Sequence, residues 1–213
     1  AVKLVKGEQK SISVSEKRLP QFLGHHEIRH EHVLANKEPG VITGLAWTAA
    51  GGEILFIETS LAPGKGNLII TGQLGDVMKE SARIALSLVK HMYPEEAAKL
   101  EDHDLHIHVP AGAVPKDGPS AGITLTTALA SLLTGKSVSP EFAMTGEVSL
   151  TGRVMPIGGL PEKLMAAERA GVKTVFIPKE NEEDLEEVAK EVREKLTILP
   201  VEKVTDVLEK VLQ

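Results

Sequence analysis

The sequence predicts a mixed α/β or α+β fold, with one compact domain behind a short N-terminal extension. Strand-like runs and runs of helical spacing intermix from residue 41 onward, without an internal repeat. The 213 residues are enough to bury one core, and 42% hydrophobic and 25% charged residues are ordinary for a globular protein. These observations favour a single mixed domain over an all-helical or repeat architecture.

Residues 1–40 differ from the rest of the chain and are predicted to be a linker or the tail of an upstream domain. Within them, residues 14–23 favour a short helical turn that stops at Gly24, although Pro20 weakens it. A polar, histidine-rich stretch then reaches Pro39-Gly40. The main domain is therefore expected to span residues 41–213.

The first half of this domain is predicted to begin with a hairpin. Residues 41–48 and 53–61 have strand character on either side of Gly51-Gly52. Apolar residues at helical spacing then predict a long amphipathic helix over 74–92. A short strand and a helix are expected next, at 105–109 and 120–133.

The second half is predicted to continue the alternation, with a strand, a helix and a strand at 142–151, 160–170 and 174–177. The charges then delimit a helix that Asn181 caps, with acidic residues in its first turn and basic residues up to Lys195 in its last. A strand at 197–199 and a helix from Val204 complete the chain.

Composition excludes several classes of function. The net charge of −6 and the 3% of aromatic residues argue against a nucleic-acid partner. The absence of cysteine excludes disulfides, thiolate metal sites and a thiol nucleophile. No run approaches a membrane span or the apolar core of a signal peptide, so we expect a cytoplasmic protein without a membrane partner.

The stretch Gly118–Gly122 fits the G-x-S-x-G pattern and makes Ser120 a candidate nucleophile. Free N–H groups at the start of a helix stabilise a developing oxyanion, although the same residues also suit a helix start without chemistry. All eight histidines precede Ser120, which excludes the α/β-hydrolase order of nucleophile, acid and histidine. A triad of Asp104, His108 and Ser120 remains an alternative.

Lys163 is the best-placed lysine for the role of general base. An ordinary lysine is protonated at neutral pH, so a base needs a pKa lowered by burial or by the positive end of a helix. Lys163 falls in the first turn of an expected Ala-rich helix, after Gly158-Gly159-Leu160-Pro161. The alternative is a solvated lysine on a surface helix.

Three other patterns are interpreted as chance matches. His26–His30 matches the H-E-x-x-H zinc motif, but its surroundings are polar and lack the periodicity of a packed helix. Ser87–Lys90 matches S-x-x-K in the middle of a helix, without the partner motifs of that class. Gly64–Asn67 lacks the upstream glycine and the Ser or Thr of a phosphate loop, so no ATP site is expected.

Four segments resemble the proteolytic domain of Lon proteases, in order and at the expected spacing. The serine segment is Pro115–Leu125 (PKDGPSAGITL), and the other three are Thr43–Thr48 (TGLAWT), Met144–Val154 (MTGEVSLTGRV) and Pro156–Leu164 (PIGGLPEKL). The likeness covers residues 41–213 and is closest to the soluble bacterial, A-type members, while residues 1–24 resemble the end of the ATPase lid. One departure is Pro161, where many relatives carry lysine.

The resemblance implies a serine endopeptidase with a catalytic dyad of Ser120 and Lys163, and with no histidine base, metal or other cofactor in this chain. It implies that Thr145 hydrogen-bonds the lysine and that Asp117 lies near the serine, with a gating role. It further implies a homohexamer that cuts unfolded or damaged proteins, fed by an ATPase domain that alone uses ATP and Mg²⁺. The rival class is a non-catalytic assembly or scaffold domain.

Overall fold

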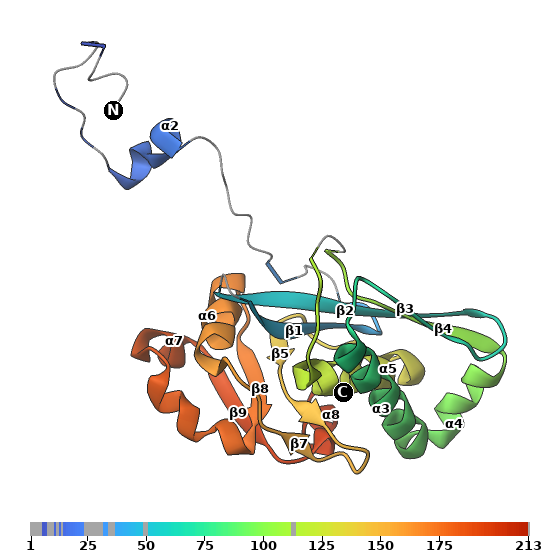
Figure 1. The fold of residues 1–213 in the computed structure, drawn as a ribbon. Helices are drawn as coiled ribbons and strands as arrows, with labels where there is room; N and C mark the ends of the chain where they lie inside the picture. The colour runs from blue at the N-terminus through green and yellow to red at the C-terminus, as the bar shows by residue number, and fades with distance from the viewer. Residues whose placement is uncertain are drawn as a thin grey trace. The chain divides into compact units, whose positions relative to one another are not determined.

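The structure is a computed structural model that describes residues 6–7, 11, 13, 15–23, 32–33, 37–48, 51–111 and 114–212 (Figure 1). The chain divides into two compact units, Ala1–His30 and Glu31–Gln213. In the first unit, η1 (Glu16–Arg18) and α2 (Leu19–Leu23) confirm the short helical turn, while Gly24 lies outside the described residues. The boundary expected after residue 40 stays a prediction.

The second unit alternates strands and helices along its whole length. In chain order its elements are β1 (Val41–Thr48), β2 (Gly51–Pro63), β3 (Leu68–Thr71), α3 (Asp76–Met92), α4 (Pro94–Ala97), η2 (Ala98–Glu101), β4 (His103–His108), η3 (Pro119–Ala121), α5 (Gly122–Thr134), β5 (Phe142–Met144), β6 (Glu147–Val148), β7 (Val154–Met155), α6 (Leu160–Ala170), β8 (Thr174–Pro178), η4 (Lys179–Asn181), η5 (Glu183–Glu187), α7 (Lys190–Lys195), β9 (Thr197–Val201) and α8 (Val204–Val211). The mixed α/β class is therefore confirmed.

The main sheet has seven strands in the order β3-β4-β2-β1-β5-β8-β9. The predicted hairpin is present, because β1 and β2 pair antiparallel from Val41↔Glu58 to Thr48↔Gly51. Strand β4 also pairs antiparallel with β2, while the remaining neighbours in the sheet pair parallel. Strands β6 and β7 form a separate antiparallel pair.

Helices cover both faces of the sheet (Figure 1). On strand β2, Ile57 points to the core that α3, α5 and α8 share, whereas Ile54 and Phe56 point to the core under α6. This alternation follows from the period of two in a strand. Because α6 packs on the opposite face from α5, the lysine helix and the helix after the serine approach the sheet from opposite sides.

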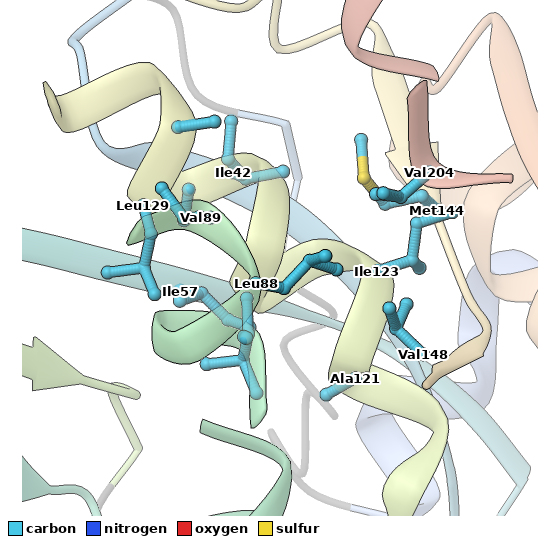
Figure 2. Packing of buried hydrophobic residues seen from close by; sticks show 14 of the residues in the cluster. Ile42, Ile57, Leu88, Val89, Ala121, Ile123, Leu129, Met144, Val148 and Val204 are labelled. Carbon is cyan, nitrogen blue, oxygen red and sulfur yellow. The ribbon is translucent and has the colours of Figure 1, made fainter. Parts of the chain in front are cut away.

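The larger core centres on α5, whose residues are nearly all buried. Figure 2 shows Ile123 and Leu129 of this helix packed among Leu88 and Val89 of α3 and Val148 of β6. A helix that is apolar on most of its circumference needs neighbours on all sides. The sheet, α3 and α8 supply them, which fixes the helix that follows the serine.

Two sequence expectations are wrong in detail. The strand expected over 142–151 is two short strands in different sheets, because the chain turns at Thr145-Gly146. The helix expected over 181–195 is broken into η4, η5 and α7, because the buried Val188 takes an extended conformation (φ −81°, ψ 131°). The strands β3 and β7 and the short helix α4 were not expected.

We expect Leu129→Ala to lower the free energy of unfolding by about 2–5 kcal/mol, because it leaves a cavity around a side chain that is 0% exposed. The matched control is Leu150→Ala, at a leucine that is 63% exposed, which should change stability by less than about 0.5 kcal/mol. Urea unfolding followed by circular dichroism measures both. Equal losses in the two variants would contradict this assignment of the core.

Candidate active site

Ser120 lies in the 3-10 turn η3, which leads directly into α5. The turn follows Gly118, whose φ of 125° lies in a region that side-chain-bearing residues rarely adopt. The N–H groups of Ser120 and Ala121 belong to the first turn of this helical segment, where no earlier helical carbonyl can accept them. Ser120 is half-buried, and the free N–H groups of its turn are of the kind that stabilises an oxyanion.

The turn between β5 and β6 holds the serine backbone in place. The carbonyl oxygen of Ser120 accepts hydrogen bonds from the Gly146 N–H at 2.8 Å and from the Thr145 hydroxyl at 3.4 Å. In return, the Ile123 N–H donates to the Gly146 carbonyl at 3.0 Å. The interruption of the expected strand is thus what docks this turn onto the serine.

Lys163 reaches the same turn from α6. Its side chain is 2% exposed, and its Nζ donates to the Thr145 hydroxyl at 3.1 Å. Burial lowers the pKa of the Lys163 ammonium from 10.5 to about 8, since desolvation disfavours the charged form. Thr145, itself fully buried, therefore connects the lysine amine to the serine backbone.

Two leucines of α6 flank Lys163 in the core on its side of the sheet. Leu160 and Leu164 are buried beside it, but Met165 is 43% exposed and points away from this core. Helix α6 begins at Leu160, so Pro161 is its second residue. Burial lowers the pKa of Lys163, because desolvation disfavours its charged form.

Asp117 connects the serine segment to the start of α3. Its Oδ1 accepts hydrogen bonds from the Met78 N–H at 2.9 Å and from the Gly118 N–H at 2.9 Å. Met78 is the third residue of α3, a position whose N–H has no partner within the helix. Asp117 therefore acts here as a helix cap, three residues before Ser120.

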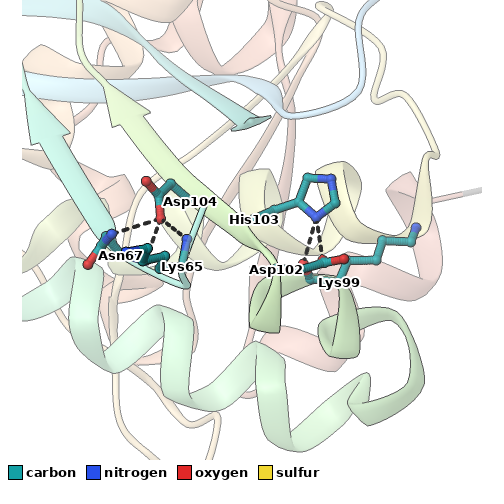
Figure 3. Close-up of polar contacts among 6 residues, drawn as sticks. All are labelled: Lys65, Asn67, Lys99, Asp102, His103 and Asp104. Atoms are coloured by element: carbon teal, nitrogen blue, oxygen red, sulfur yellow. Dashed lines mark hydrogen bonds and ion pairs between the residues drawn. The ribbon is translucent and has the colours of Figure 1, made fainter. Parts of the chain in front are cut away.

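The histidine alternative is not assembled. His108 shares the Thr71 hydroxyl with His106, at 2.7 Å from Nδ1 of His108. Figure 3 shows Asp104 bound instead to Lys65 and Asn67, whose backbone N–H groups lie 2.9 and 2.8 Å from its Oδ1. Asp104 and His108 stand four residues apart on β4, or roughly 13 Å along a strand. The aspartate therefore cannot orient that imidazole.

The other patterns also fall outside the site. Ser87 and Lys90 lie on the exposed side of α3, and the serine hydroxyl donates to the Arg83 carbonyl. The segment His26–His30 lies outside the described residues. Within the described part of the chain, no group of three or more potential ligands could hold a metal ion. Among the described helices none is both long and apolar enough to cross a membrane.

Asn181 is a supporting residue that the sequence reasoning missed. Its side chain is 3% exposed, accepts a hydrogen bond from the Ile157 N–H at 2.9 Å and donates to the Ile157 carbonyl at 2.8 Å. Ile157 precedes Gly158-Gly159 and the first turn of α6. Asn181 thus fixes the start of the lysine helix rather than capping a helix of its own.

A mixed α/β domain in which one buried threonine joins a serine turn to a lysine of lowered pKa has the make-up of a serine hydrolase. The comparison with known proteins gives the family. Residues 13–213 match the Lon protease (S16) C-terminal proteolytic domain, and the chain belongs to that family. It is therefore a serine endopeptidase domain, as the resemblance of its four segments implied.

Relatives from distant organisms agree with this assignment. The chain is 57% identical to a Lon protease of Clostridium beijerinckii over 94% of its length, and 55% identical to one of Methanosarcina barkeri over 91%. It is 53% identical to Lon protease 1 of Bacillus subtilis over 97%. The matched regions make up 24–27% of these three relatives, so the chain spans about a quarter of their length.

We expect Gly52→Ala to destabilise the site, because the hairpin backbone lies against α6. A Cβ at Gly52 would sit 1.9 Å from the Glu162 carbonyl oxygen and 3.0 Å from the backbone nitrogen of Lys163. Either the hairpin or the helix must move, at a cost of about 1–3 kcal/mol. Peptidase activity should fall with it.

Gly158→Ala is the matched control, since a Cβ there would meet nothing within 4 Å. Thermal unfolding and peptide cleavage should leave this variant close to wild type. Two variants of equal stability would show that the hairpin does not constrain α6.

Proposed function

We propose that this chain hydrolyses peptide bonds with Ser120 as the nucleophile and Lys163 as the general base. The observation that carries the proposal is the buried amine of Lys163, held 3.1 Å from the Thr145 hydroxyl with its pKa lowered to about 8. A neutral amine can accept a proton, and near physiological pH a fraction of the protein molecules carries Lys163 in its neutral form. Thr145 also contacts the backbone of Ser120, so the two groups share one support.

The reaction follows from these positions. The neutral Lys163 amine takes the Ser120 proton as the serine oxygen attacks the peptide carbonyl, and N–H groups at the helix start stabilise the oxyanion. The ammonium then gives its proton to the leaving amine, and water releases the acyl group in the same manner. Among the described residues, no hydrogen bond joins the Ser120 hydroxyl to Lys163. Direct proton transfer between them therefore requires the Ser120 side chain, or the turn that carries it, to rotate when substrate binds.

The wider role is part of the same proposal. The relatives are Lon proteases of about four times this length, which supports a domain working in a longer protein. In this proposal the substrates are unfolded or damaged proteins, and an ATPase domain that binds ATP and Mg²⁺ delivers them. The domain itself needs no cofactor, assembles as a homohexamer and works in the cytoplasm without a membrane or nucleic-acid partner.

Labelling with a fluorophosphonate tests the nucleophile. The reagent should modify Ser120, and mass mapping should place the adduct on the peptide that contains it. Ser120→Ala should lose labelling and should lose cleavage of an unstructured protein by roughly 10⁴-fold or more, with unchanged circular dichroism. Labelling that persists in Ser120→Ala, or inhibition of wild type by EDTA, would contradict the proposal. An inert wild type would support the rival scaffold role.

The pH dependence tests the base. The kcat/KM of wild type should rise about tenfold per pH unit in the acidic range and level off above the Lys163 pKa of about 8. Lys163→Arg should be nearly inactive at every pH, because guanidinium does not give up its proton. His108→Ala should keep the wild-type profile. An inactive His108→Ala beside an active Lys163→Arg would assign the base to histidine.

Stability provides a readout of the same amine that does not depend on turnover. A lysine whose pKa is lowered on folding opposes folding wherever the unfolded chain holds that proton. The penalty is complete below pH of about 8 and vanishes as the pH rises past 10.5. Lys163→Met should therefore be more stable than wild type at neutral pH, by about 1–3 kcal/mol, with the difference shrinking in alkali. Urea unfolding across this range measures it.

A further inference from the structure

Lys116 binds backbone carbonyl groups close to the segment that carries the serine. Its Nζ donates to three carbonyl oxygens, those of Ala111 at 2.8 Å, Val114 at 3.0 Å and Gly72 at 3.2 Å. Two of these carbonyls belong to the loop after β4, and the third belongs to the connection between β3 and α3. One ammonium therefore joins two segments that lie about forty residues apart in the sequence.

The backbone of Lys116 strengthens this junction. Its N–H donates to the Gln73 carbonyl at 3.0 Å, and its own carbonyl accepts from the Gly75 N–H at 2.8 Å. The next residue, Asp117, then caps α3 at Met78. The chain from 116 to 117 is thus fixed on the start of α3, only three residues before the nucleophile.

The conformation of the joined segments needs such a restraint. Gln73, with φ of 58°, and Ala111, with φ of 61°, are the non-glycine residues of positive φ in the described part of the chain. Residues with side chains seldom adopt this conformation and keep it only where their surroundings hold them. The carbonyl oxygens of both residues accept hydrogen bonds from Lys116, that of Gln73 from the backbone N–H and that of Ala111 from the ammonium group.

We propose that Lys116 is a positioning residue that holds the Ser120 turn in its reactive place by tying Ala111 and Val114 to the β3–α3 connection. This inference rests on the proposed role of Ser120 as nucleophile. An ammonium suits the task because its N–H donors can point to several carbonyls that converge from different directions, whereas the donors of an arginine guanidinium lie in one plane. Lys116→Met keeps the aliphatic chain and removes the donors, and Lys116→Arg restores charge and donors in a poorer geometry.

The chain offers a matched control in Lys136, whose Nζ donates to the Leu212 carbonyl at 3.1 Å, away from the serine segment. Lys136→Met removes the same kind of contact. Any general loss of stability should appear in both methionine variants, whereas a change at the serine should appear only in Lys116→Met. Ser120→Ala supplies the unlabelled baseline.

The experiment measures, on the 213-residue chain, the rate of fluorophosphonate labelling at Ser120 across pH, well below each variant's melting temperature. Lys116→Met should label roughly 10- to 100-fold more slowly, as expected for a misplaced nucleophile. Its pH midpoint should stay at the wild-type value, because Lys163 sets it, and KM for an unstructured peptide should change less than kcat. Lys116→Arg should recover part of the rate, and Lys136→Met should label like wild type.

Hydrogen exchange separates failure of this inference from failure of the proposed function. In Lys116→Met, but not in Lys136→Met, the Met78 and Gly118 amides should exchange faster, because Asp117 no longer holds them. Labelling of Lys116→Met at the wild-type rate overturns the positioning role while Ser120 stays the nucleophile. If wild type itself does not label, the proposed function fails, and unchanged exchange at these amides overturns the junction as well.

Discussion

The rest of the site depends on the burial of one amine. Taking the Lys163 ammonium out of water lowers its pKa from 10.5 to about 8, which corresponds to roughly 3 kcal/mol against the charged form. A fold keeps such a group only where the neighbouring elements exclude water firmly and leave it a hydrogen-bond partner. Here the β1–β2 hairpin lies on the first turn of α6 through Gly52, and the Thr145 hydroxyl accepts a hydrogen bond from the amine.

The second constraint is the turn that follows β5. The Thr145 N–H still donates to the Phe176 carbonyl of β8, but the backbone groups of Gly146 no longer pair with a neighbouring strand. Because the chain leaves the sheet there, the Gly146 N–H and carbonyl bind Ser120 and Ile123, on either side of the start of α5. The Thr145 side chain then faces both Lys163 and the Ser120 backbone. The irregular backbone thus joins two helices that pack on opposite faces of the sheet.

The sequence predicts the elements whose periodicity is long and uninterrupted. The hairpin of β1 and β2, the helix α3 and the helix α6 lie close to the residues expected, since each buries one regular face. Short pairings such as β6 with β7 carry too few residues for a pattern. Asn181 shows the other difficulty. Its polar character suits a cap equally well, and its partner Ile157 is 24 residues away, so no local signal reveals the contact.

The candidate site residues also could be assigned only in part from the local sequence pattern. The G-x-S-x-G pattern by itself supports a helix start as well as a nucleophile, and Lys163 by itself resembles a surface lysine. Burial distinguishes a catalytic lysine from a surface lysine, and burial is a property of the assembled fold. The histidines show the converse, because His106 and His108 lie on a part of the sheet that leaves them partly exposed, with their ring nitrogens on Thr71. A base at neutral pH can be an exposed imidazole or a buried amine, and this fold encloses the amine.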